Sequence, residues 1–97
     1  MAQPLFLREG WLQKRGAINK AYKKRFFRLD KESLKYFKDE SSSIERGHIN
    51  GISEICDFNQ DETKFILKPN HFMGRTYYLK AESADDKARW VKAISEV

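Results

Sequence analysis

Short runs of β-branched and aromatic residues follow one another along this 97-residue chain, and turn residues separate them at intervals of about 8 to 12 positions. This spacing is typical of a meandering antiparallel sheet or barrel, because each run can form one strand and each break one turn. The sequence therefore predicts seven strands, at about 8–15, 22–30, 33–38, 47–52, 55–59, 63–68 and 75–81.

The last segment changes from a strand period to a helical one. Trp90, Val91, Ile94 and Val97 fall on one face of a helix. Ser83, with Asp86 three residues later, resembles a capping box and marks the start of that helix. We expect one amphipathic helix after the strands.

The length suits a single domain over 1–97, with its core at about 8–97, and favours binding over catalysis because so small a chain builds little deep cleft. The lone Cys56 excludes an internal disulfide and fits a small buried apolar residue in a reducing compartment. Residues 1–8 lack the pattern of a signal peptide, and no run of about 18 apolar residues occurs. We expect a cytoplasmic location without a membrane span.

The positive charge is concentrated in the N-terminal half of the chain. The net charge is +5 overall, but residues 1–50 carry twelve Lys or Arg against six Asp or Glu, whereas residues 51–97 carry seven against eight. Between Lys14 and Arg25 there are six cations and no acid. Such a segment attracts a polyanion, which could be a lipid headgroup, an anionic membrane surface or a nucleic acid.

Strand parity predicts where these cations point. Side chains alternate across a strand, so Lys23 and Arg25 share a face with the apolar Phe27 that follows them. Leu12 and Lys14 show the same change from apolar to cationic on the first strand. Three cations are therefore expected at one mouth of the barrel.

An anion is the natural occupant of such a mouth, because like charges in a partly dehydrated site repel one another. Arginine offers a planar fork for phosphate oxygens, and lysine offers a compact charge. The alternative is that the three cations only form a hydrated rim around an open barrel end.

The motifs resemble those of the pleckstrin-homology (PH) domain family. Glu9–Lys14, Tyr22–Leu29 and Leu34–Phe37 resemble the first three strands of that family, and the Trp90 helix resembles its closing helix. The resemblance covers the chain from about Arg8 to Val97. It implies a barrel of seven antiparallel strands in two near-orthogonal sheets, capped at one end by the helix.

Lys14 followed by Lys23-x-Arg25 is similar to the signature of family members that bind lipids phosphorylated at the inositol 3-position. The resemblance implies a membrane-recruitment module for the 3,4,5-trisphosphate or the 3,4-bisphosphate, located at the inner face of the plasma membrane or another phosphoinositide-bearing membrane. The headgroup residues it implies are Lys14, Lys23, Arg25, Tyr36 and Arg46. Auxiliary positions are Arg15, Lys20, His71 and Arg75, and the loop tip expected to contact the membrane is Ala17 and Ile18.

Other functions have weaker support. A PH domain that binds a protein partner, with weak affinity for anionic lipids, remains the main alternative. Nucleic acid is not expected as a partner, because aromatic residues such as Trp11, Phe27 and Tyr78 fit core positions better than a stacking platform. Catalysis, metal binding and cofactors are not expected, since His48 and His71 have no metal-ligand spacing and no Gly-rich phosphate loop occurs.

Overall fold

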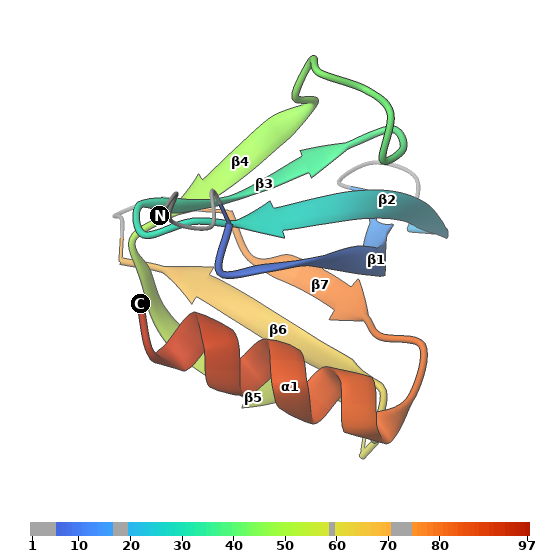
Figure 1. Cartoon of the computed structure of the whole chain (residues 1–97). Coiled ribbons are helices and arrows are strands. Elements are labelled where there is room, and N and C mark those ends of the chain that lie inside the picture. Colours follow the sequence, from blue (N-terminus) through green and yellow to red (C-terminus); the bar gives the residue numbers. More distant parts are fainter. Residues whose placement is uncertain (1–5, 17–19, 59, 71–74) are drawn as a thin grey trace.

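The computed structural model describes residues 6–16, 20–58, 60–70 and 75–97, and it consists of seven strands followed by one helix (Figure 1). The first four strands are β1 Arg8–Arg15, β2 Tyr22–Leu29, β3 Ser33–Phe37 and β4 Gly47–Asn50. The remaining elements are β5 Ile52–Asp57, β6 Lys64–Pro69, β7 Tyr77–Lys80 and the helix α1 Ala84–Ser95. The predicted order of elements is confirmed.

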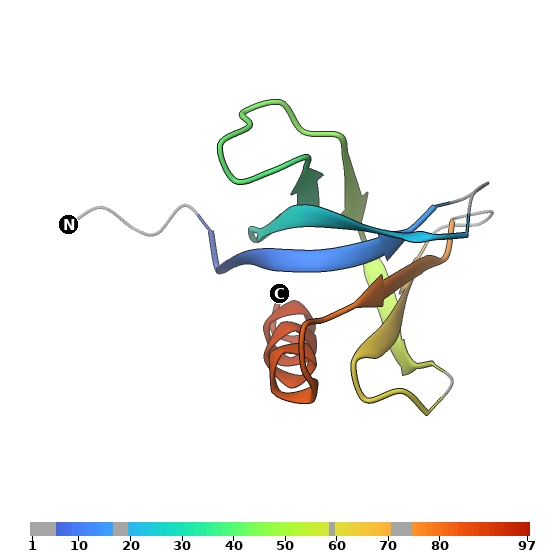
Figure 2. The ribbon, with the colours of Figure 1, turned by 90° about the vertical axis from the view of Figure 1, so that its right-hand side faces the viewer.

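All seven strands belong to one antiparallel sheet, in the order β4-β3-β2-β1-β7-β6-β5. Strand β1 pairs with β2 over its whole length, but it pairs with β7 only at Gln13↔Lys80 and Lys14↔Leu79. At this short junction the sheet bends, and β1–β4 and β5–β7 form two layers (Figure 2). The described strands thus form one continuous bent sheet, where two sheets were expected.

The predicted boundary between the fourth and fifth strands is wrong. Ile52 begins β5 instead of ending β4, because the chain turns at Gly51, whose φ is +57°. Glycine reaches this left-handed conformation without the steric penalty that a Cβ brings. The last strand is also shorter than predicted, at Tyr77–Lys80.

The core lies between the two layers and under α1. Leu12, Phe27 and Leu29 are at most 2% exposed, so the predicted inward face of the first hairpin is confirmed. Trp90 is fully buried, and its indole packs so closely on β1 that a Cβ placed at Gly10 would lie 3.4 Å from it. Figure 2 shows α1 seated between the layers, on the side away from the end of β1.

The start of α1 forms only half of the predicted capping box. Ser83 Oγ accepts a hydrogen bond from the Asp86 backbone N–H at 3.0 Å, but the Asp86 carboxylate accepts one from Arg8 at 2.7 Å. The helix ends at Ser95, so the placement of Val97 on its buried face is wrong, and Val97 is 53% exposed. In the part of the chain described, no helix could span a bilayer.

Candidate functional site

A pocket of about 260 Å³ opens among the first three strands and the residue before β4. Its lining consists of Lys14, Gly16, Lys23, Arg25, Tyr36 and Arg46. The structure therefore brings together all five residues that the sequence analysis assigned to the headgroup. Four cations and a phenol in one pocket have the chemistry of an anion site.

The strand register explains this convergence. Lys14 is the direct cross-strand partner of Lys23, and Arg25 lies two residues further along the same face of β2. Tyr36 enters from β3, where it pairs with Phe27 on one side and with Gly47 on the other. The hairpin parity thus places the three β1–β2 cations together, and the β3 register adds the tyrosine.

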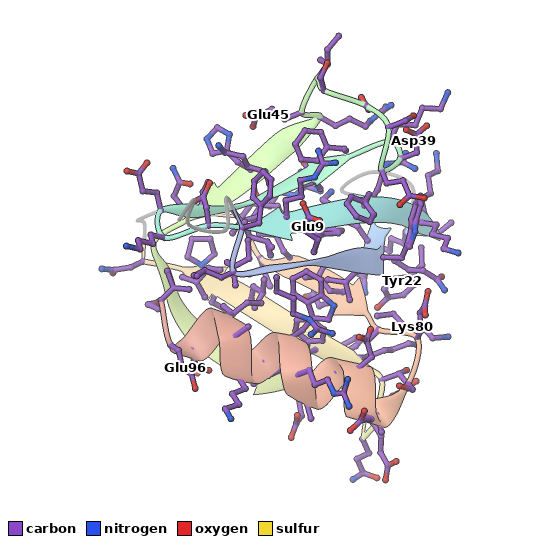
Figure 3. All side chains as sticks on the ribbon, in the orientation of Figure 1. Glu9, Tyr22, Asp39, Glu45, Lys80 and Glu96 are labelled. Carbon is purple, nitrogen blue, oxygen red and sulfur yellow. The ribbon has the colours of Figure 1, made fainter. Side chains whose placement is uncertain are left out.

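Within the described part of the chain, no carboxylate neutralises the pocket. Lys14, Lys23, Arg25 and Arg46 form no ion pair within 4.0 Å there, whereas eight pairs occur elsewhere. Glu45, next to Arg46 in sequence and labelled in Figure 3, instead contacts His48 Nδ1 at 2.9 Å. Arg25 Nη1 donates a hydrogen bond to the Lys24 backbone carbonyl at 2.8 Å, which leaves the positive charge of Arg25 unneutralised.

Burial and like charge act on Lys14 in the same direction. Partial burial lowers the pKa of the Lys14 ammonium, and the nearby charges of Arg75 and Arg25 lower it further. Burial also raises the pKa of the Tyr36 phenol, which keeps that hydroxyl protonated and able to donate a hydrogen bond. The site thus contains a partly buried cation and a phenolic donor.

The Lys14 ammonium makes cation–π contacts with two aromatic rings. Lys14 Nζ lies 5.0 Å from the centre of the Tyr36 ring and 5.7 Å from that of Tyr77. Phe27, fully buried, packs behind Tyr36 with a distance of 5.5 Å between ring centres. Cation–π contacts of this kind hold an ammonium group without neutralising it.

The auxiliary residues occupy different surroundings. Arg75 is exposed, its guanidinium lies 5.0 Å from the centre of the Tyr77 ring, and its charge lowers the pKa of Lys14.

The Arg15 guanidinium lies 4.2 Å from the centre of the Tyr78 ring and is absent from the pocket lining, as expected for the residue after Lys14 on a strand. Lys20 is exposed and also absent from that lining. Ala17, Ile18 and His71 lie outside the described residues.

The surroundings of Arg15 form a separate cluster. Lys64 Nζ lies 5.2 Å from the centre of the Tyr22 ring, and Tyr22 is the cross-strand partner of Arg15. Tyr22 and Lys80 lie at the same side of the molecule in Figure 3. Asp61 accompanies these cations, with an oxygen 3.8 Å from Lys64 Nζ. This cluster is partly neutralised, unlike the pocket.

Tyr77 and Gly16 also lie at the site, and neither was predicted from the sequence. Tyr77 reaches Lys14 because β1 pairs with β7, and strand pairing between distant segments leaves no local signal in the sequence. Gly16 follows β1 directly and contributes to the lining. The position of Gly16, directly after the cationic residues that end the first strand, could have indicated that it lies at the pocket.

A second pocket, of about 220 Å³, lies between the β4–β5 turn and the end of α1. Its lining is mainly apolar, with residues such as Leu34, Ile49 and Ile94. The charged residues there are Lys31 and Glu32, whose charges cancel. It is therefore poorly suited to a polyanion.

Comparison of the sequence with known proteins identifies the family of this chain. The PH domain family model matches residues 6–97. A sterol 3-beta-glucosyltransferase of Glomerella lagenarium is 35% identical over 95 residues, which is 94% of this chain and 6% of that enzyme. The human dual adapter for phosphotyrosine and 3-phosphotyrosine and 3-phosphoinositide is 35% identical over 98 residues, which is 96% of this chain and 34% of the adapter.

Among solved structures, the C-terminal PH domain of pleckstrin in complex with D-myo-Ins(1,2,3,5,6)P5 superposes with a TM-score of 0.84. It is 23% identical, and the match covers 98% of this chain and 97% of that one. At this identity the likeness shows the fold. The chain spans only a small part of the curated relatives it matches.

Proposed function

Because this chain belongs to the PH domain family, we propose that it binds the phosphorylated inositol headgroup of membrane lipids in the pocket around Lys14 and Arg25. Binding there would recruit the protein that carries it to the cytoplasmic face of a phosphoinositide-bearing membrane. The observation that carries this proposal is the convergence of Lys14, Lys23, Arg25, Tyr36 and Arg46 on one pocket that no carboxylate neutralises among the described residues.

The pocket chemistry suits a ring that carries several phosphates. Arg25 and Arg46 can each present a planar fork to two phosphate oxygens, and Lys14 can add a compact charge. The lowered pKa of Lys14 reflects the very conditions, partial dehydration and neighbouring cations, that an arriving phosphate would relieve. Tyr36 adds a donor at the edge of the ring.

We propose further that the preferred lipids are phosphorylated at the inositol 3-position, as the 3,4,5-trisphosphate, the 3,4-bisphosphate or both. The support is the pattern Lys14 with Lys23-x-Arg25 and the similarity to an adapter whose name includes 3-phosphoinositide. Solved PH domains that share this fold also bind inositol phosphates, since one is a complex with an inositol pentakisphosphate and another with inositol 4-phosphate. We propose binding and no catalysis; the sterol glucosyltransferase activity is that of the fungal relatives.

A diffuse attraction to acidic membranes is the competing explanation, because six cations lie between Lys14 and Arg25. Each basic residue near an anionic surface contributes about 1 kcal/mol, and salt screens that attraction within about 8 Å. Such a patch would bind all acidic lipids and lose them together as salt rises. A pocket with directed bonds would keep its selectivity while its total affinity falls.

The test is vesicle binding with lipids of matched surface charge. Vesicles would carry a 3-phosphorylated phosphoinositide, the 4,5-bisphosphate or phosphatidylserine, and binding would be followed from low salt to about twice physiological ionic strength. We expect the 3-phosphorylated lipids to bind best at every salt concentration. Equal binding to all three, falling in parallel with salt, would support the diffuse patch and exclude the pocket. A preference for the 4,5-bisphosphate would support binding in the pocket and would exclude the proposed selectivity for lipids phosphorylated at the 3-position.

A further inference from the structure

Gly47, the first residue of β4, lies directly opposite Tyr36 in the β3–β4 register. A Cβ built on Gly47 would lie 2.5 Å from Tyr36 Cζ and 3.0 Å from Cε1, and it would overlap the phenolic oxygen. Carbon atoms in contact normally lie about 3.5 to 4.0 Å apart. The Tyr36 ring therefore occupies the space that any side chain at residue 47 would need.

The backbone of Gly47 gives no other reason for a glycine. Among the described glycines, Gly51 has a φ in the left-handed region and Gly47 does not. A glycine inside a strand otherwise weakens it, because it offers no side chain to pack and loses more conformational freedom on folding. The missing side chain at Gly47 is thus explained by the approach of Tyr36.

We propose that Gly47 is a positioning residue of the headgroup site: its bare backbone seats the Tyr36 ring across β4 and so shapes the wall of the pocket. This inference rests on the proposed function of that pocket. In its seat, the ring has the buried Phe27 behind it and the Lys14 ammonium over its face at 5.0 Å. Gly47 thereby controls two groups that would touch the ligand, Tyr36 and, through it, Lys14.

A methyl group at residue 47 should displace the ring and leave the strands in place. The backbone is held by the pairing of β3 with β4, and the Arg46 N–H donates to the Tyr36 carbonyl at 2.8 Å. The phenol is the free end of a side chain and can move at less cost than the paired backbone. Because the buried Phe27 leaves no room in the core, the ring should turn toward Lys14 and into the pocket.

The first experiment measures binding of the free headgroup of the 3,4,5-trisphosphate lipid. Gly47→Ala should weaken binding about tenfold, the effect of losing one charge-assisted hydrogen bond. His48→Ala is the matched control, since His48 is the next residue of β4 and is exposed. Unchanged affinity in Gly47→Ala, or an equal loss in His48→Ala, would overturn the inference.

A double-mutant cycle separates ring displacement from a general loss of stability. With Tyr36→Ala no ring remains to be displaced, so adding Gly47→Ala should change affinity less than about twofold. Tyr36→Phe removes the hydroxyl and its hydrogen bond but keeps the ring carbons that meet the new Cβ, so Gly47→Ala should still push the ring toward Lys14 and weaken binding. If Gly47→Ala weakened binding as much in the Tyr36→Ala protein as in the Tyr36→Phe protein, Gly47 would act without the Tyr36 ring and the inference would be overturned.

A measurement without ligand distinguishes this inference from the proposed function itself. Nuclear magnetic resonance of the Lys14 ε-methylene group reports its position over the Tyr36 ring, because aromatic rings shift the resonances of nearby protons. Gly47→Ala should change that shift with little loss of thermal stability, and an unchanged shift would overturn the inference. Failure of the unaltered domain to bind any inositol phosphate would instead reject the proposed function.

Discussion

Lys14 and Lys23 face each other as direct partners across the β1–β2 pair. Among the described residues neither forms an ion pair with a carboxylate, and Arg25 on the same face adds a third positive charge. Like charges directly opposite each other destabilise a sheet. The unliganded domain therefore carries unfavourable electrostatics at the place where an anion would bind.

Lys14→Met should therefore stabilise the unliganded domain while weakening headgroup binding. The change removes the charge and keeps the apolar stem, so the free energy of unfolding should rise by up to about 1 kcal/mol. Affinity should fall about tenfold or more. Urea unfolding and calorimetric titration measure the two quantities. Lys38→Met, at an exposed lysine outside the pocket, is the control and should change neither. A destabilised Lys14→Met protein would contradict the prediction.

Arg25→Ala should reduce affinity for the headgroup about tenfold to a hundredfold, because charge-assisted hydrogen bonds contribute about 1.5 to 3 kcal/mol each. The fold should persist, since Arg25 lies at the pocket and outside the buried core. Vesicle sedimentation measures the loss, and the near-ultraviolet circular dichroism of the aromatic residues checks the fold. Lys24→Ala, the next residue and on the other face of β2, is the matched control. Equal affinities of both variants and the unaltered domain would exclude the pocket.

The pH dependence of binding should reveal the lowered pKa of Lys14. Burial and the charges of Arg75 and Arg25 lower that pKa, so the unliganded domain gains stability as the pH rises through it toward the ordinary lysine value. A bound phosphate should raise the pKa again, so binding takes up a proton and weakens with rising pH. As the pH rises toward the ordinary pKa of lysine, the affinity of the unaltered domain should fall more steeply than that of Lys14→Arg, which stays charged. Parallel profiles would contradict this.

Trp90→Ala should lower the free energy of unfolding by about 3 to 5 kcal/mol, a large part of the stability of a small domain. Trp90 is fully buried and packs against Phe27 with ring centres 6.5 Å apart. Thermal and urea unfolding measure the effect. Lys92→Ala, exposed on the same helix, should change stability by less than about 0.5 kcal/mol. A near-normal melting temperature in Trp90→Ala would mean that α1 contributes little to the core.

The strand and helix order was predictable because its signals are local. Alternation of apolar and polar residues placed Phe27 and Leu29 inward, and the helical period placed Trp90 and Ile94 in the core. The errors fell at element ends. Ile52 belongs to β5 and not to the predicted fourth strand, because the chain turns at Gly51, which has a positive φ. Val97 lies beyond the last turn of α1. Such boundaries depend on single backbone angles, which hydrophobic periodicity does not encode.

The sequence by itself determined that Lys14, Lys23 and Arg25 share one face, because parity along two adjacent strands is a local property. Only the tertiary structure decided what surrounds them. The β1–β7 pairing brings Tyr77 and Arg75 to Lys14, while the β3–β4 register sets Tyr36 against Gly47. Arg8 donates a hydrogen bond to the Asp86 carboxylate, 78 residues further along the chain, so this carboxylate does not complete the capping box of α1. These contacts arise from the register between distant segments, which is chosen when the whole core packs.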